Sequence, residues 1–210
     1  MAKAGTEHEI QNEGKLREVY AEPSHGAVAK QLARLDPHCK RFIELSPFFC
    51  LGSSRADGLG DVSPRGGEPG FVHVLDETTL AIPDRPGNNR LDSLTNLLHN
   101  PAVGLLFFLP GVNEMLRING VARLSVEPAL MERFEMNGKP PRSVMLVDVK
   151  EAYLHCAKAV ARSGLWKAET QIERSSFPTA GEIFRDQMKL DVPAKAVDEA
   201  LDENTRTELY

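Results

Sequence analysis

The sequence predicts a small antiparallel β-barrel with helices packed on its outside, and two observations favour this fold class. First, about six short segments are apolar or alternate between apolar and polar residues, as strands do, and turn residues such as Gly and Pro separate them. Second, the chain has no regular strand–helix alternation and no GxGxxG motif, which argues against a doubly wound parallel sheet.

Composition predicts an ordinary soluble protein. The chain has 210 residues, of which 41% are hydrophobic and 26% are charged. Its net charge is -5, and its pI is about 5.7. Because binding to a phosphate backbone needs clustered positive charge, this balance argues against nucleic acid as a partner.

The same sequence argues against a membrane segment and a metal site. No apolar run approaches the roughly 18 residues that a membrane helix needs, and the first 15 residues lack the apolar core of a signal peptide. We therefore expect a cytoplasmic protein. Cys39, Cys50 and Cys156 are an odd, widely spaced set, which is typical of neither a disulfide framework nor a zinc site.

Three parts are expected along the chain. Residues 1–22 are polar and predict a flexible segment. Residues 23–190 predict a single barrel domain with helices at both ends. Residues 191–210 form an acidic tail that either docks as a helix or frays.

Two short helices are expected before the barrel. Ser24 is a candidate N-cap for the first, whose apolar residues recur near helical spacing as far as Leu32 and Leu35. Asp36 is a candidate N-cap for the second, with Pro37 at its first position.

The barrel segments follow. Residues 102–109 are almost continuously apolar and predict a buried central strand, whereas residues 114–126 alternate and predict a long, half-exposed strand. A helix at 91–99 should bury its leucines, and a second helix should cover 152–163 after the last strand. The expected strands are 48–55, one starting near 61, 70–76, 78–83, 102–109, 114–126 and 143–155, with a short helix at 128–136.

The segment that precedes the helix at 91–99 predicts a phosphate site. Pro86-Gly87 can form a tight turn, after which a helix begins whose first N–H groups are unpaired and suit an anion. Arg90 could clamp a phosphate through paired hydrogen bonds, while Asn88 and Asn89 could donate amide hydrogens. The same residues also fit a capped helix start with surface arginines.

Two further features indicate a ligand. Residues 60–72 are rich in Gly and Pro, and Gly66-Gly67 would let the backbone approach a flat ligand near Ser63 and Arg65. A flexible hairpin loop is the other interpretation. Arg117 lies among apolar residues of a strand, where it either meets an anionic partner or faces solvent.

Three segments resemble, in this order, the pyridoxamine 5'-phosphate oxidase-like superfamily of FMN-binding split β-barrels. They are DVSPRGGEPGFV, IPDRPGNNRLDSLTNLLHNPAVGLLFFLPG and LRINGVARLS. The resemblance is closest to a bacterial subgroup of FMN-dependent enzymes with no assigned substrate, and EAYLHCAKAVARSGLW looks like the ending of that subgroup. The resemblance as a whole extends from the helix that starts near Ser24 to Trp166.

The resemblance implies a split-barrel homodimer that holds FMN in two clefts at the subunit interface. Ser63–Arg65 would line the isoalloxazine, Ile82-Pro83 would precede the phosphate turn, and Asn89-Arg90 would grip the phosphate. Arg117 would face the cofactor region, and Trp166 would come from the other subunit. The residues expected to bind FMN are therefore Ser63, Pro64, Arg65, Ile82, Pro83, Asn88, Asn89, Arg90, Arg117 and Trp166.

The chain also departs from the true oxidases. Glu114-Met115 stands where they carry an Arg-Gln pair, and their carboxy-terminal Arg and His around a Trp are not evident. We therefore expect an FMN-dependent oxidoreductase that acts on some other small organic substrate. Arg65 and Arg117 are candidates for stabilising the anionic reduced flavin.

Other interpretations stay open at this point. The protein could be a flavin- or haem-binding carrier or sensor with little turnover, or a barrel that binds a phosphate ligand without redox chemistry. Deazaflavin could replace FMN. His73 and His155 lie in or near expected strands, but a lone histidine is more often structural, and the sequence names no catalytic residue.

Overall fold

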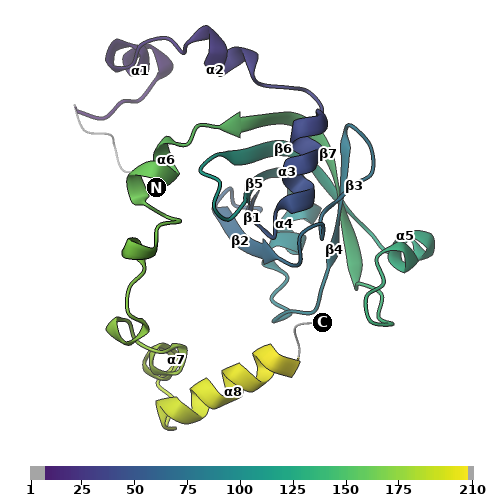
Figure 1. Ribbon diagram of the computed structural model, residues 1–210, viewed down its shortest axis with the longest axis vertical. Helices are drawn as coiled ribbons and strands as arrows, with labels where there is room; N and C mark the ends of the chain where they lie inside the picture. The colour runs from purple at the N-terminus through teal and green to yellow at the C-terminus, as the bar shows by residue number, and fades with distance from the viewer. Residues whose placement is uncertain (1–7, 208–210) are drawn as a thin grey trace. The chain divides into compact units, whose positions relative to one another are not determined.

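The computed structural model describes residues 8–207, and the chain divides into two compact units, Met1–Gln31 and Leu32–Tyr210. The first unit contains α1 (Glu13–Val19) and α2 (His25–Ala29), which are labelled in Figure 1. Neither helix buries a residue. No helix among the described residues is both long enough and apolar enough to cross a membrane. The predicted domain boundaries stay a prediction.

The helix predicted from Ser24 to Leu35 is shorter than expected. The Ser24 side chain does cap α2, but the helix ends at Ala29. Leu32 instead exchanges two backbone hydrogen bonds with Ala152, and Leu35 is buried in the core. Pairing with a strand has therefore overridden the helical spacing of the two leucines.

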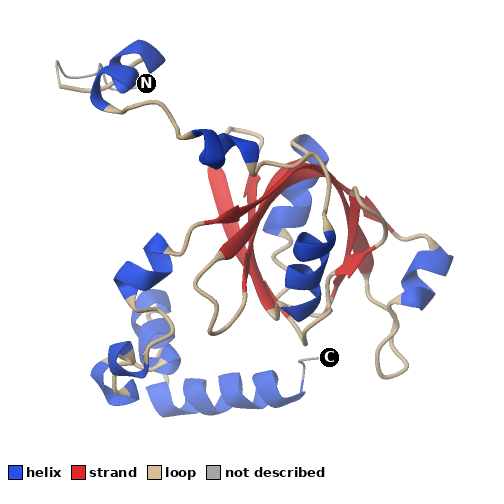
Figure 2. Cartoon of the chain, turned by 45° about the horizontal axis from the view of Figure 1, so that its top comes forward, coloured by secondary structure: helices blue, strands red, loops and turns tan. Residues whose placement is uncertain are grey.

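The second unit is built on a seven-stranded antiparallel sheet with the order β2-β1-β5-β6-β7-β4-β3. The sheet curls into a split β-barrel with flanking helices, which confirms the predicted fold class (Figure 2). The strands are β1 (Phe48–Ser54), β2 (Gly60–Gly66), β3 (His73–Val74), β4 (Thr79–Asp84), β5 (Ala102–Phe108), β6 (Met115–Ser125) and β7 (Ser143–His155).

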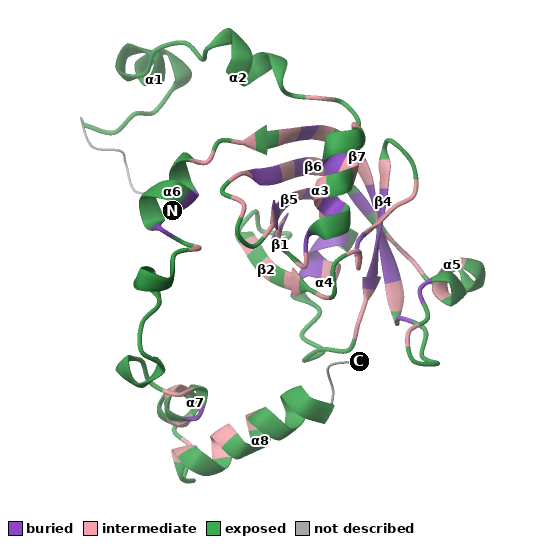
Figure 3. Cartoon of the chain, viewed as in Figure 1, coloured by how far each residue is buried: buried purple, intermediate pink, exposed green. Residues whose placement is uncertain are grey.

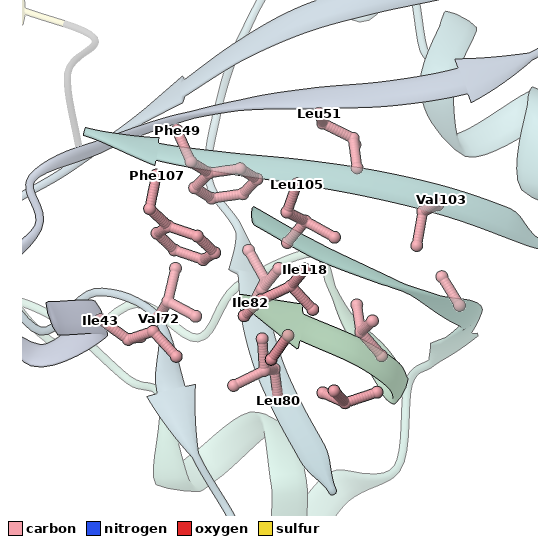
Figure 4. Close-up of a cluster of buried hydrophobic side chains, with 14 of the residues drawn as sticks. Ile43, Phe49, Leu51, Val72, Leu80, Ile82, Val103, Leu105, Phe107 and Ile118 are labelled. Atoms are coloured by element: carbon pink, nitrogen blue, oxygen red, sulfur yellow. The ribbon is translucent and has the colours of Figure 1, made fainter. Parts of the chain in front are cut away.

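Alternate residues of these strands fill the barrel. Phe49 and Phe107 are fully buried, with ring centroids 4.9 Å apart, and Leu105 and Ile118 lie beside them (Figure 4). The burial colours alternate along the strands for the same reason (Figure 3). β5 is central, as predicted, but only one of its faces is fully buried in the single chain.

Helix α3 (Pro37–Leu45) begins as predicted. The Asp36 side chain accepts a hydrogen bond of 2.7 Å from the backbone N–H of Cys39, and this bond lowers the pKa of the Asp36 carboxyl. Cys39 lies on the buried face of α3, and this burial raises the pKa of its thiol to about 11, so the cysteine behaves as a core residue.

Helix α4 (Asp92–His99) buries a different face from the predicted leucine face. Leu97 is buried, but Leu98 is 74% exposed and Leu91, just before the helix, is 51% exposed. Ser93 and Asn96 are buried instead, because α4 packs on β1 and β2 through polar contacts that are described below.

The predicted helix at 152–163 is also wrong in part. Residues 152–155 continue β7, where they pair with β6 from Met115 to Ile118, and only α6 (Lys158–Ser163) is helical. Pairing with β6 thus keeps residues 152–155 in a strand, although their apolar spacing had suggested a helix. Helix α5 (Pro128–Arg133) agrees with the prediction.

The carboxy-terminal part is helical. Two 3₁₀ turns, Ala168–Thr170 and Arg174–Ser176, precede α7 (Ala180–Met188) and α8 (Ala194–Thr207). Helices α7 and α8 pack against each other, and the Gly181 N–H donates a hydrogen bond of 2.7 Å to the Asp198 carboxylate. The acidic tail therefore forms a helix over 194–207, and residues 208–210 lie outside the described part.

Candidate functional site

The candidate site is a cleft of about 460 Å³ between β2, the end of β4 and the start of α4. This volume lies in the range of small-molecule and cofactor sites. The residues that line it are Asp61, Val62, Ser63, Pro64, Arg65, Gly66, Phe71, Ile82, Pro83, Asp84, Arg85, Pro86, Gly87, Asn88, Asn89, Arg90, Leu91, Asp92, Ser93, Leu94, Arg142 and Met145.

Strand β2 supplies one wall of the cleft. It is the edge strand of the sheet, so Pro64 is tolerated although it has no N–H to donate. The Arg65 guanidinium lies 3.3 Å from Asp84, and its side chain is 28% exposed. Its Nε is buried and has no hydrogen-bond partner among residues 8–207. A buried donor of this kind fits a site that accepts a ligand oxygen or nitrogen.

Asp84 closes β4 at the floor of the cleft. Burial raises the pKa of its carboxyl, and the nearby guanidinium groups of Arg65 and Arg142 act in the opposite direction. The side chain is only 15% exposed, so the carboxylate depends on these two cations for compensation of its charge.

The turn after Asp84 has an unusual backbone. Asn89 and Leu91 have φ values of 57° and 59°, in the left-handed region that leucine in particular rarely adopts. The Asn88 side chain accepts a hydrogen bond of 3.1 Å from the Arg90 N–H. Leu91 precedes α4 without a side-chain cap, so no side chain occupies the first N–H groups of that helix among the described residues. The turn therefore leaves donors available for an anion.

A polar network anchors α4 beside this turn. The Asp61 carboxylate accepts hydrogen bonds from Asn96 (3.0 Å), Ser53 (3.3 Å) and Ser93 (3.4 Å). Asn96 also donates to the Ser53 hydroxyl at 2.9 Å. Since Ser53, Ser93 and Asn96 are buried, the network fixes α4 against β1 and β2 at the edge of the cleft.

Eight of the ten residues predicted to bind FMN line this one cleft. They come from β2, from β4 and from the turn, which the curled sheet brings together. They are Ser63, Pro64, Arg65, Ile82, Pro83, Asn88, Asn89 and Arg90.

The other two lie elsewhere in the chain. Arg117 is on the outward face of β6, where its guanidinium stacks 4.1 Å from the Tyr153 ring centroid and lies 3.7 Å from Glu151. Its Nε is buried without a partner among the described residues. The Trp166 indole N–H donates a hydrogen bond of 2.8 Å to the Val112 carbonyl.

Sequence reasoning missed Asp61, Asp84 and Arg142. Asp84 lay inside the predicted turn, but its residue type suggested no role at an anion site. Arg142 is 53 residues from Asn89 in the sequence. Only the pairing of Asp84 with Ser143 in the β4–β7 ladder brings Arg142 to the cleft. A strand register of this kind is not readable from one sequence.

Neither singled-out histidine lines the cleft. His73 packs 4.5 Å from the Phe134 ring centroid, and burial, followed by the charges of Arg133 and Arg85, lowers the pKa of its imidazole. The His155 ring lies 4.8 Å from that of Tyr153 on β7. Among residues 8–207 no group of three His, Cys, Asp or Glu side chains could hold a metal ion.

The chain belongs to the pyridoxamine 5'-phosphate oxidase family of FMN-binding split β-barrels. The family model for "Pyridoxamine 5'-phosphate oxidase" matches residues 35–156, which is more than half of the chain and includes every residue of the cleft. No curated protein matches the chain significantly.

Solved structures resemble the chain more distantly. HupZ from Group A Streptococcus is 15% identical and covers 57% of this chain and 93% of its own, with a TM-score of 0.47. General stress protein 26 from Bacillus anthracis is 14% identical and covers 56% and 93%, with a TM-score of 0.42. An FMN-binding protein from Syntrophomonas wolfei is 9% identical and covers 56% and 83%, with a TM-score of 0.41.

Proposed function

We propose that the protein is an FMN-dependent oxidoreductase that acts on a small organic substrate, with FMN held in the cleft between β2 and α4. The observation that carries the proposal is the shared cleft: in a member of an FMN-binding family, the strand 63–65 and the turn 85–90 face the same space. Arg65 is one of the lining residues, and its buried Nε has no partner within residues 8–207, which supports a ligand acceptor close to it.

The residues of the cleft fit the two ends of FMN. The turn from Arg85 to Arg90 would take the phosphate, because it presents backbone and amide donors next to arginine side chains. The segment 63–65 would lie along the isoalloxazine, with Arg65 as the donor that stabilises negative charge on it. When it is bound, FMN supplies the electron transfer, and these residues supply position and electrostatics.

We further propose a homodimer, as the resemblance implies. Arg117 supports this proposal, because its guanidinium is half-exposed on the outer face of β6 and retains a buried Nε without a partner among the described residues. A second copy packed on this face would bring further acceptors to Arg117. In such a dimer, residues of both subunits would determine which substrate and which electron donor the site accepts.

A flavin carrier or sensor with little turnover is the second candidate. One observation favours it: the described lining of the cleft contains no His, Cys, Tyr or Lys, so its titratable acids are all aspartates. Histidine is the commonest general acid–base group in enzymes, and a carrier does not need one.

Anaerobic mixing with NADH or NADPH, followed by air or a quinone, separates the two candidates. An oxidoreductase should show bleaching of the oxidised-flavin absorbance at roughly 450 nm within seconds, followed by its return over repeated cycles. Flavin that stays oxidised with both donors, or that is reduced only by dithionite, would contradict an oxidoreductase driven by NADH or NADPH and favour the carrier.

A further inference from the structure

The cleft contains four arginines, and they differ in how far their charges are already compensated. Arg65 faces the Asp84 carboxylate at 3.3 Å, and Arg90 donates to the Asp92 carboxylate at 2.7 Å, an interaction that raises the pKa of Arg90. An arginine engaged by a carboxylate attracts a second anion less strongly.

Arg85 and Arg142 have neutral partners instead. Arg85 donates a hydrogen bond of 2.9 Å to the Phe134 carbonyl, which directs part of its guanidinium toward the end of α5. Arg142 donates a hydrogen bond of 2.8 Å to the Asn89 side-chain oxygen. Within residues 8–207 neither arginine forms an ion pair with a carboxylate.

The backbone fixes Arg142 beside the turn. Its N–H donates a hydrogen bond of 3.2 Å to the Asp84 carbonyl, which extends the β4–β7 ladder beyond the Asp84–Ser143 pair. The preceding Pro141 is buried, and its ring restricts the chain that enters β7. The Arg142 side chain is exposed, so an anion can reach it.

The contact with Asn89 also orients a second donor. Because the Asn89 oxygen accepts from Arg142, its amide nitrogen remains as a donor at the same turn. Asn89 has a φ of 57°, and the hydrogen bond from Arg142 holds its side chain in that conformation. A guanidinium with no carboxylate in direct contact among residues 8–207 and an amide donor thus lie together in the cleft at the predicted phosphate site.

We infer that Arg142 is the principal cation for the phosphate monoester at this turn, with Asn89 as its neighbouring donor and Arg90 in a lesser role. This inference rests on the proposed function. It transfers the main electrostatic contact with the phosphate from Arg90 to Arg142, about 50 positions further along the chain. It follows that Arg142 discriminates phosphorylated from unphosphorylated flavin.

The test compares the binding of FMN and riboflavin to the full chain by quenching of flavin fluorescence. Arg142→Gln should weaken FMN binding roughly 10- to 100-fold, the range for a hydrogen bond to a charged group, while riboflavin binding changes less than about twofold. Arg142→Lys should fall between wild type and Arg142→Gln. Arg90→Gln should weaken FMN binding less than Arg142→Gln does.

Arg123→Gln is the matched control, because Arg123 lies on β6 outside the cleft and pairs with Asp148 at 2.8 Å. If wild type binds FMN and Arg142→Gln binds it as tightly as Arg123→Gln does, the Arg142 assignment is wrong and the proposed function stands. If Arg142→Gln weakens riboflavin as much as FMN, the residue is structural, and the assignment is again wrong. Wild type that does not bind FMN overturns both.

Discussion

The Arg65 guanidinium lies 3.3 Å from the Asp84 carboxylate and joins β2 to β4, two strands that are not neighbours in the sheet. The ion pair connects the β2 edge of the sheet to β4 beside the candidate cleft. It therefore links the stability of the barrel to the geometry of the candidate site.

Arg65→Met should destabilise the protein without FMN by about 1–3 kcal/mol, because it leaves the Asp84 carboxylate largely buried without its nearest cation. Arg123→Met, which breaks the more exposed Arg123–Asp148 pair, should cost less than about 1 kcal/mol. Urea denaturation of both variants measures the difference. Equal losses would show that the Arg65–Asp84 pair behaves as an ordinary surface pair.

Arg90→Ala should weaken FMN binding by about tenfold and leave the fold intact, since Arg90 is exposed and its charge is shared with Asp92. Arg55→Ala is a suitable control, because Arg55 is an exposed arginine paired with Asp57 at 3.1 Å, outside the cleft. Fluorescence titration gives both affinities. Full FMN affinity in Arg90→Ala would remove this residue from the phosphate site.

Asn96→Ala should destabilise the protein by about 1–3 kcal/mol, because Asp61 and the buried Ser53 hydroxyl both lose a donor. Thr95→Ala, at an exposed position of the same helix, should stay within about 0.5 kcal/mol of wild type. Thermal unfolding compares the two variants. A loss no larger in Asn96→Ala than in Thr95→Ala would mean that the network does not anchor α4.

Asp36→Ala should cost about 1 kcal/mol at pH 7, because α3 loses its N-cap, while Asp36→Asn should retain most of that stability. The pKa of Asp36 is lowered in the folded state, so its contribution is present above the unfolded pKa of about 3.9 and is lost as the pH falls through the folded value. Urea denaturation between pH 7 and pH 3 should show the gap between wild type and Asp36→Ala narrowing. A gap that widens toward pH 3 would contradict this assignment.

The parts of the fold that the sequence predicted are those that local chemistry dictates. Asp36-Pro37 starts a helix through its own side chain and ring, and alternation marked β6 because one face of that strand meets the core. The errors occur where distant pairing prevails. Leu32 pairs with β7, and residues 152–155 continue a ladder with β6, although both segments have helical spacing.

Most of the lining of the candidate cleft was predictable for a similar reason, while its role stays a prediction. The turn 85–90 and the segment 63–65 carry their chemistry in consecutive residues, so a single sequence displays them. Asp61 and Arg142 have no such local signal, since their roles depend on the packing of α4 and on the register of β4 with β7. The leucine spacing of α4 predicted the wrong buried face because Ser93 and Asn96 meet polar partners.

FMN binding in the cleft is tested most directly by the visible absorption spectrum of freshly purified protein that has been incubated with FMN and freed of excess. The flavin that denaturation releases is then identified. We expect a yellow protein that releases FMN at about one equivalent per chain, the stoichiometry of one cleft in each chain. A protein that stays colourless after incubation with FMN would contradict the central claim, and the turn 85–90 would then serve another anion or only the start of α4.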